Sequence, residues 1–435
     1  MKKNITKYLL LALACLGLQS CLFQEENYFD DSSANRATAD VSRCGELLKG
    51  APNGWVMEYY VGKDYSLGGI TLLCRFDGQR VTMASQMSEA DETVSSLYSV
   101  KSEQATMLSF DTYNYLVHYF GQPQGSMSDD PNGTLGGDYE FIISSASAER
   151  IELKGKKYGN RIVMKALTED QTWKQYLTKI KKVEDDAFFY EYDLLMDGLY
   201  TGQMIRSNYT FIVTYYDEIG KVHQKTVPFM FTADGLRFHE PVTIDGQTMQ
   251  NFVWKNELIS FVCTDEGATG VKLAGVYTAG YQSYDYYPGT YQMDFYRLND
   301  ETGQLEVASQ EVRLLKNEDG KSYWLKGLEY DILVMYDKPR GGLSVSPQLL
   351  KKVQGGYVYL AMWDVMNDYV LRNKSIGLIS YATTNGIYLV DNGVWMGEVS
   401  GFIFGVYNSQ EEDAAFIGYT DAFASIRLVK KTIEE

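Results

Sequence analysis

Three histidines, His118, His223 and His239, are the side chains of this chain best suited to ligate a haem iron or another transition metal. A bis-histidine haem site requires two of them to converge in space, which their positions along the chain do not decide. His118 lies in a tyrosine-rich stretch beside Asn114, where a structural role is the simpler interpretation. A haem or metal carrier is therefore kept as an alternative function, and no cofactor is predicted outright.

The longest loop-like segment covers residues 121–138 (GQPQGSMSDDPNGTLGGD). Loops of this length without secondary structure are usually functional or disordered. Four of its side chains offer the oxygen ligands that Ca²⁺ prefers, but they match only part of a calcium loop, and turn chemistry explains the Pro-Asn-Gly run. Acids from this loop and the following strand are also the candidates for a hydrolase acting on glycan or peptide. The possible calcium ligands are Asp129, Asp130, Asn132 and Asp138, and the acids to be tested for hydrolysis are Asp138 and Glu140.

Aromatic residues make up 14% of the chain, and 35 tyrosines outnumber 19 phenylalanines. Tyrosine and tryptophan rings on an exposed sheet could stack against sugars, since they offer flat apolar area with a polar handle. The competing interpretation is that they are cross-strand partners within a β-sheet. The densest group is Tyr277, Tyr281, Tyr284, Tyr286, Tyr287, Tyr291 and Tyr296. The predicted ligand-binding residues are Tyr284, Tyr286, Tyr287, Tyr291, Trp324, Trp363, His118 and Asp138.

Signatures of catalysis are missing from the sequence. There is no Gly-x-Ser-x-Gly elbow, and Pro241 after His239-Glu240 rules out a His-Glu-x-x-His zinc helix. Gly320-Lys321-Ser322 resembles the end of a P-loop, but the upstream glycine is replaced by Leu315, so a hairpin turn is favoured. The net charge of −17 argues against a nucleic-acid partner. These features favour a non-enzymatic role, and no catalytic residue is predicted.

The N-terminus carries a signal for export. Three lysines precede an apolar run over residues 8–18, which is shorter than the ~20 residues that span a bilayer and is typical of a secretory signal. The following segment, LQSC at residues 18–21, resembles the lipobox of bacterial lipoproteins. That resemblance implies cleavage before Cys21 and acylation of this residue, which anchors the protein to a bilayer.

The remaining cysteines, Cys44, Cys74 and Cys263, are odd in number and have no Cys-x-x-Cys spacing. This pattern disfavours both a disulfide framework and a zinc finger. We expect buried free thiols that pack as small apolar side chains. The sequence does not decide which of the three lie near one another.

The apolar pattern predicts a mainly β fold of antiparallel meander, sandwich or barrel-like domains, with a short N-terminal helix and one inter-domain helix. The first helix is expected after Ser32 or Ser33, and the second after a capping box formed by Thr168 and Gln171. Elsewhere the period is two, with Asp-Gly and Asn-Gly turns. The expected division is a signal peptide (1–20), a tether (21–33), a helix and β-meander domain (34–167), a helix and β domain (168–270) and a tyrosine-rich C-terminal β domain (271–435).

Four segments carry a more specific resemblance: PNGW at 52–55, LSFDTYN at 108–114, GDYEF at 137–141 and LKGKK at 153–157. In this order they resemble an uncharacterised family of Bacteroidetes outer-membrane lipoproteins, the domain of unknown function numbered forty-three hundred and two. The resemblance covers residues 52–157, with looser similarity to about residue 265. It implies a place at the outer membrane, often beside TonB-dependent nutrient uptake systems, and it supplies no catalytic residues.

Together these observations predict a lipid-anchored protein on the outer face of a bacterial outer membrane. Its expected role is a non-enzymatic, nutrient- or partner-binding accessory of an uptake system. The expected partners are the bilayer through acylated Cys21, a TonB-dependent transporter or its lipoprotein partner, and a glycan. An extracellular hydrolase and a haem or metal carrier remain the alternatives, and calcium is the other metal considered.

Overall fold

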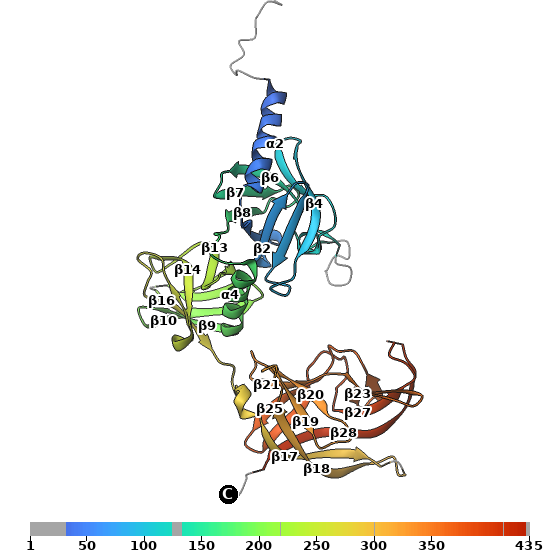
Figure 1. Ribbon diagram of the computed structural model, residues 1–435. Helices are drawn as coiled ribbons and strands as arrows, with labels where there is room; N and C mark the ends of the chain where they lie inside the picture. Colours follow the sequence, from blue (N-terminus) through green and yellow to red (C-terminus); the bar gives the residue numbers. More distant parts are fainter. Residues whose placement is uncertain (1–31, 124–132, 218, 300, 412, 432–435) are drawn as a thin grey trace, which may run out of the picture.

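The computed structural model describes residues 32–123, 133–217, 219–299, 301–411 and 413–431. Three bodies of antiparallel strands follow one another along the chain, and helices are few (Figure 1). The prediction of a mainly β fold with barrel-like domains is confirmed. In the described part of the chain, no helix combines the length and apolarity needed to cross a bilayer.

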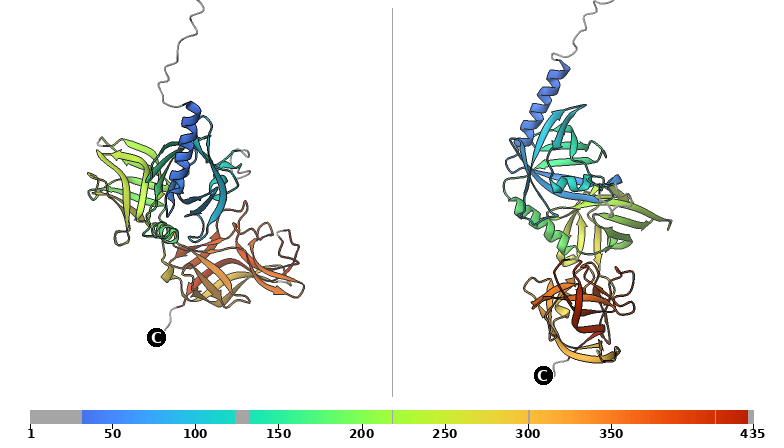
Figure 2. Two further views of the ribbon diagram at one scale, coloured as in Figure 1. Left: turned by 45° about the horizontal axis from the view of Figure 1, so that its top comes forward. Right: turned by 90° about the vertical axis from the view of Figure 1, so that its right-hand side faces the viewer.

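The first secondary-structure element of the described chain is helix α2 (Ser33–Lys49), which the sequence predicts. The Ser32 hydroxyl caps its first turn by accepting a hydrogen bond from the Asn35 amide at 3.1 Å. Cys44 and Leu48, one turn apart, are buried against the first barrel. The N-terminal end of α2 projects beyond the first barrel (Figure 2).

The first barrel is a closed ring of eight strands in sequence order, and it closes where β1 pairs with β8. Between β5 and β6 the chain forms the short helix α3 (Tyr115–His118) and a 3₁₀ turn (Tyr119–Gly121). The strands are β1 (Trp55–Val61), β2 (Gly68–Asp77), β3 (Arg80–Ser85), β4 (Val94–Ser102), β5 (Thr106–Phe110), β6 (Glu140–Ala146), β7 (Arg150–Gly155) and β8 (Arg161–Ala166).

Helix α4 (Trp173–Asp186) connects the first barrel to the second. Its capping box is formed by Thr172 and Gln175, so the prediction of a box at Thr168 and Gln171 is wrong. The physical reason is that the Asn53 side chain donates to the carbonyls of residues 168 and 171, at 2.7 and 2.8 Å, and holds this turn outside the helix.

The second barrel is also a closed ring of eight strands, in which β9 pairs with both β10 and β16. Because β16 belongs to this ring, the second barrel extends beyond the predicted boundary at residue 270. The polar run at residues 264–270 is the hairpin loop between β15 and β16. The strands are β9 (Glu191–Met196), β10 (Leu199–Ser207), β11 (Thr210–Tyr216), β12 (Val222–Phe231), β13 (Gly235–Ile244), β14 (Gln247–Lys255), β15 (Ser260–Cys263) and β16 (Val271–Val276).

The third body is a twelve-stranded sheet in which the pairing of β17 with β28 closes a ring of eight strands. The long strand β28 has a positive φ of 49° at Ser425. Its part before Ser425 pairs with β27, and its last residues pair with β17 and β26. The strands are β17 (Gly289–Leu298), β18 (Leu305–Lys316), β19 (Ser322–Lys326), β20 (Ile332–Asp337), β21 (Gly342–Val345), β22 (Gln348–Val353), β23 (Gly356–Asp364), β24 (Tyr369–Leu371), β25 (Leu378–Thr383), β26 (Gly386–Asp391), β27 (Gly401–Tyr407) and β28 (Phe416–Lys430).

The first two barrels pack closely against each other. Gly68, at the start of β2, lies against the backbone of Tyr209, where a Cβ atom would stand 2.0 Å from the Tyr209 carbonyl oxygen. The third body meets the second through aromatic rings, with Phe188 stacked on Tyr281 at a centroid distance of 6.0 Å. Lys338 adds an ion pair to Asp185 at 2.8 Å.

Candidate functional site

A pocket of about 470 Å³ lies between the first and second barrels. Its walls come from β1, β7 and β8 of the first barrel and from β13 and β14 of the second. Sites between domains are common places for ligands, because two surfaces can enclose them. The lining residues are Glu58, Tyr60, Tyr65, Arg150, Arg161, Val163, Lys165, Arg237, His239, Glu240, Pro241 and Gln250.

Strand β1 positions the first of these residues. Its alternation points Met57 and Tyr59 into the first barrel and leaves Glu58 and Tyr60 on the outer face. In most barrels that outer face would be solvated, but here every residue of β1 is buried, because the second barrel and α4 cover it. Glu58 is thus a carboxylate enclosed between two domains, with 8% of its surface exposed.

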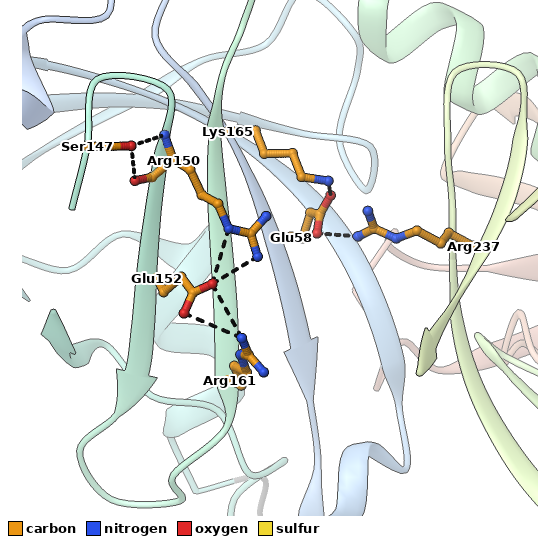
Figure 3. A network of polar contacts seen from close by, with 7 residues as sticks. All are labelled: Glu58, Ser147, Arg150, Glu152, Arg161, Lys165 and Arg237. Atoms are coloured by element: carbon orange, nitrogen blue, oxygen red, sulfur yellow. Dashed lines mark hydrogen bonds and ion pairs between the residues drawn. The ribbon is translucent and has the colours of Figure 1, made fainter. Parts of the chain in front are cut away.

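Two carboxylates organise the cations of the pocket (Figure 3). Glu58 accepts a hydrogen bond from Lys165 of β8 at 2.8 Å and forms an ion pair with Arg237 of β13, across the interface. Burial opposes the charge of Arg237, but Glu58 outweighs it, so that the pKa of Arg237 is raised.

Glu152 of β7 forms a second centre, close to the first in the same view (Figure 3). It pairs with Arg150 at 3.0 Å and with Arg161 at 3.3 Å. These two arginines are more exposed than Arg237, with 44% and 64% of their side-chain surface accessible. They are therefore free to reorient towards a ligand at modest cost.

Aromatic rings form the rest of the pocket. The imidazole of His239 packs between the rings of Tyr60 and Tyr65, at centroid distances of 4.3 and 4.0 Å. Burial lowers the pKa of His239 below its usual value of 6.5, so the ring is neutral at pH 7. Gln250 fixes the backbone there by donating to the His239 carbonyl at 3.3 Å.

The Tyr60 hydroxyl is the least satisfied polar group of this site. It is buried against the Arg237 guanidinium, yet it forms no hydrogen bond of normal geometry within the described structure. Burial raises the pKa of Tyr60, so the group remains a neutral donor. A buried hydroxyl without a partner is costly and requires an explanation. A ligand that accepts a hydrogen bond from this hydroxyl would supply one.

Charge gives the pocket its character. Four cations line it together with the carboxylates Glu58 and Glu240, and Glu152 lies beside Arg150 and Arg161, although the chain as a whole carries a net charge of −17. Arginine and lysine donors that converge with a neutral histidine and a free tyrosine hydroxyl are suited to an anion.

His118 and Asp138, two predicted ligand-binding residues, lie on the first barrel and do not line the pocket. The His118 ring stacks on Tyr139 at a centroid distance of 4.7 Å and remains half-exposed, so its role stays a prediction. Asp138 is buried, and its two oxygens accept backbone hydrogen bonds from Lys157 at 2.7 Å and Tyr158 at 3.1 Å. It is thus committed to holding the loop after β7 and cannot reach a ligand.

The residues considered for calcium and catalysis are not brought together in the described structure. Asp129, Asp130 and Asn132 lie outside the described residues, as does Cys21 with the signal segment. Glu140 is engaged by Lys101 at 2.7 Å and Lys156 at 2.9 Å. Among the described residues, no group of three histidine, cysteine, aspartate or glutamate side chains could hold a metal ion.

The three histidines have separate surroundings. His223 stacks on Tyr215 at 5.3 Å and contacts Asp217 through Nε2 at 2.8 Å. None of the ring contacts among the described residues joins two histidines. The three thiols, Cys44, Cys74 and Cys263, are free and buried, as predicted. Burial raises the pKa of Cys263 to about 11.

The predicted sugar-stacking rings are only partly on the surface. Tyr287 and Tyr291 are buried, and their hydroxyls donate to the carbonyls of Gly341 at 2.8 Å and Tyr287 at 2.6 Å. They fill one end of the third ring, where tyrosine is preferred to phenylalanine because its hydroxyl satisfies loop carbonyls. Trp363 is buried as well, so these three rings cannot stack against a sugar.

The other three rings of that prediction are more accessible. Tyr284 is half-buried and stacks on Tyr323 at 4.6 Å, whereas Tyr286 and Trp324 are 38% and 36% exposed. They do not line the pocket between the barrels. A role for them in ligand binding stays a prediction.

The cations of the pocket were missed from the sequence, although a weak signal exists. Arg161 and Lys165 occur at even spacing in one strand, which places them on one face, and Arg237 and His239 do the same in another. Nothing in the sequence indicates that these two faces meet.

Comparisons with known proteins give a family but no activity. A family model described as a domain of unknown function (DUF4302) matches residues 25–256, and a second, also a domain of unknown function (DUF4987), matches residues 264–404. No curated protein is significantly similar to the chain.

Two solved structures show remote likeness. One is a protein of unknown function of the DUF3598 family from Nostoc punctiforme, with 8% identity, 56% of this chain and 98% of that chain covered, and a TM-score of 0.14. The other is the vaccine antigen transferrin-binding protein B from Haemophilus parasuis, with 11% identity, 87% and 75% covered, and a TM-score of 0.12. At these TM-scores neither structure is a guide to function.

Proposed function

The chain belongs to the DUF4302 family of domains of unknown function, and we propose that it is a lipid-anchored, non-enzymatic binding protein of the bacterial outer membrane. In this proposal it holds a small anion, with a carboxylate, phosphate or sulfate group, in the pocket between its first two barrels. The observation that carries the proposal is a pocket lined by four cations and by a buried Tyr60 hydroxyl that forms no hydrogen bond of normal geometry, in an otherwise acidic protein.

The anchor part of the proposal rests on the segment that ends at Cys21. An acylated Cys21 would hold the soluble bodies at the bilayer, and the acidic surface would keep them off anionic lipid head groups. A TonB-dependent transporter or its lipoprotein partner is the proposed recipient of the bound anion.

We expect the protein from bacterial membranes to incorporate labelled palmitate, and a Cys21→Ser variant to incorporate none. Lipid attachment requires the Cys21 thiol, whereas the folding of the three bodies does not depend on it. The measurement is metabolic labelling followed by intact-mass analysis of the purified protein. A wild-type mass that corresponds to an unmodified chain would refute the anchor without affecting the pocket.

We expect a Tyr60→Phe variant to be more stable than wild type by about 1 kcal/mol, because it removes a buried hydroxyl that lacks a partner. The same change should weaken sulfate binding by about tenfold, because the anion loses a donor. Urea denaturation and titration calorimetry with sulfate measure the two effects.

The matched control is Tyr59→Phe on the same strand. The Tyr59 hydroxyl donates to the Asp138 carbonyl at 2.8 Å, so its loss should destabilise the protein and leave sulfate affinity unchanged. Absence of sulfate binding to the wild type up to about 10 mM, with phosphate and citrate also failing, would contradict the proposed function.

We expect sulfate to bind more tightly at about pH 5.5 than at about pH 7.5, where free His239 is neutral. A bound anion favours the imidazolium, so binding takes up a proton and strengthens as the pH falls. The other charged groups near this ring are Glu240, Arg237, Arg161 and Glu58. Calorimetry across this range measures the effect, and a His239→Gln variant should flatten it. A wild-type affinity that does not change with pH would exclude His239 from the site.

A further inference from the structure

The third body has a groove of its own, far along the chain from the pocket between the barrels. Its volume is about 750 Å³, within the range of sites for small molecules. Residues of β17, β18, β26 and β28 form it, together with the loop between β26 and β27, and core side chains such as Phe295 and Ile426 also border it.

The floor of the groove is a row of directly opposed residues across four strands: Ser309, Asp294, Arg427 and Tyr388. Arg427 donates to Asp294 at 2.7 Å, and Gln292 donates to the other oxygen of Asp294 at 3.0 Å. The positive charge of Arg427 is therefore already balanced within the protein. The floor offers fixed polar edges without a net charge.

The walls differ in character. On one side, Tyr296 and Val307 lie opposite each other on β17 and β18, with 43% and 80% of their surface exposed. On the other side, Asp391 and Glu398 border the groove. The Asp391 carboxylate is held in place by the backbone amides of Gly393 at 3.0 Å and Val399 at 3.3 Å.

These features indicate what kind of ligand the groove can bind. The two carboxylates of the wall repel anions, in contrast to the pocket between the barrels. An exposed tyrosine ring offers a flat apolar surface, and the fixed carboxylate oxygens accept hydrogen bonds. A ligand that fits both has apolar faces and many hydroxyl groups and carries no negative charge.

We propose that this groove binds a neutral oligosaccharide, with Tyr296 stacked on a sugar ring and Asp391 and Glu398 accepting hydrogen bonds from hydroxyl groups. Of the seven clustered tyrosines in the sequence, Tyr296 is the one that lines the groove. The site goes beyond the proposed anion pocket and does not depend on it.

The test is titration calorimetry of the mature protein with cellohexaose, maltohexaose, xylohexaose and laminarihexaose, and with an acidic galacturonate hexamer. We expect at least one neutral hexaose to bind. A Tyr296→Ala variant should weaken that binding by about tenfold, and Glu398→Gln should weaken it less. Tyr296→Phe, which keeps the ring, should bind like wild type. The matched control is Tyr200→Ala, an exposed tyrosine on the second barrel.

A second measurement does not depend on the folding of any variant. Hydrogen exchange of the wild type should slow in residues 391–400 when the hexaose is bound. Failure of all neutral hexaoses to bind, stronger binding of the galacturonate hexamer, or unchanged binding by Tyr296→Ala would each overturn the proposal. Sulfate binding in Tyr296→Ala should remain normal, which separates this proposal from the anion pocket.

Discussion

A Glu58→Gln variant is expected to lose about 3–5 kcal/mol of stability in the unit formed by the first two barrels. The substitution keeps the shape of the side chain but removes its charge. Arg237, with only 20% of its side chain exposed, would then be enclosed without a counter-ion beside Lys165. Urea denaturation followed by tryptophan fluorescence measures the change, and the third body should unfold as in the wild type.

The chain offers a matched control for Glu58 in Glu103. Glu103 also pairs with two lysines, Lys101 at 3.2 Å and Lys156 at 2.9 Å, but all three side chains are well exposed. Glu103→Gln should cost much less stability than Glu58→Gln, because water screens these pairs. Equal losses in the two variants would mean that the interface of the barrels does not depend on the charge of Glu58.

A Gly68→Ala variant is expected to separate the first two barrels or to unfold them at lower urea concentration. The residue has a φ of +72°, and its new Cβ would stand 2.0 Å from the Tyr209 carbonyl oxygen. This closest contact is to backbone, so no flexible side chain can move away to relieve the clash. We expect a loss above about 3 kcal/mol, measured by denaturation and by protease cleavage between the barrels.

The control for Gly68 is Gly78→Ala. Gly78 also has a positive φ, of +56°, but a Cβ there would meet nothing within 4 Å. Its substitution should therefore show only the conformational cost, about 1–2 kcal/mol. The difference between the two variants measures the close approach of the barrels, and a difference of zero would contradict it.

Much of the fold follows from local pattern. The alternation of Ile70, Leu72, Cys74 and Phe76 predicts strand β2, and Asp77-Gly78 predicts the turn that ends it, as observed. The spacing of apolar residues likewise predicts α2. These elements are set by contacts between residues close in sequence, which a sequence displays directly.

The closure of the rings could not be predicted in this way. Strand β16 follows a polar loop that resembles a linker, and only its pairing with β9 shows that it completes the second barrel. Likewise, the capping box begins at Thr172 and not at the predicted Thr168, because Asn53, distant in the chain, holds the preceding turn outside the helix. Long-range pairings override local signals in both cases.

The candidate site was beyond prediction for the same reason. Glu58 and Arg237 belong to different barrels, and each appears in sequence as an ordinary charged residue on a strand. The tyrosine cluster led to the opposite error. The sequence suggests that Tyr287 and Tyr291 lie on a sugar-binding surface, but both are buried at one end of the third ring. Burial of whole faces depends on how domains pack, which composition and period do not encode.

The pairing of β28 with β17 has a consequence for how the protein is made. The first two rings are complete once β16 has been synthesised, but β17 waits for residues 424–430, since Asp294 pairs with Arg427. Until then its backbone groups on that side can recruit strands of other chains. A chain that stops before residue 424 would keep that state permanently, so aggregation of nascent or shortened chains should begin in the third body.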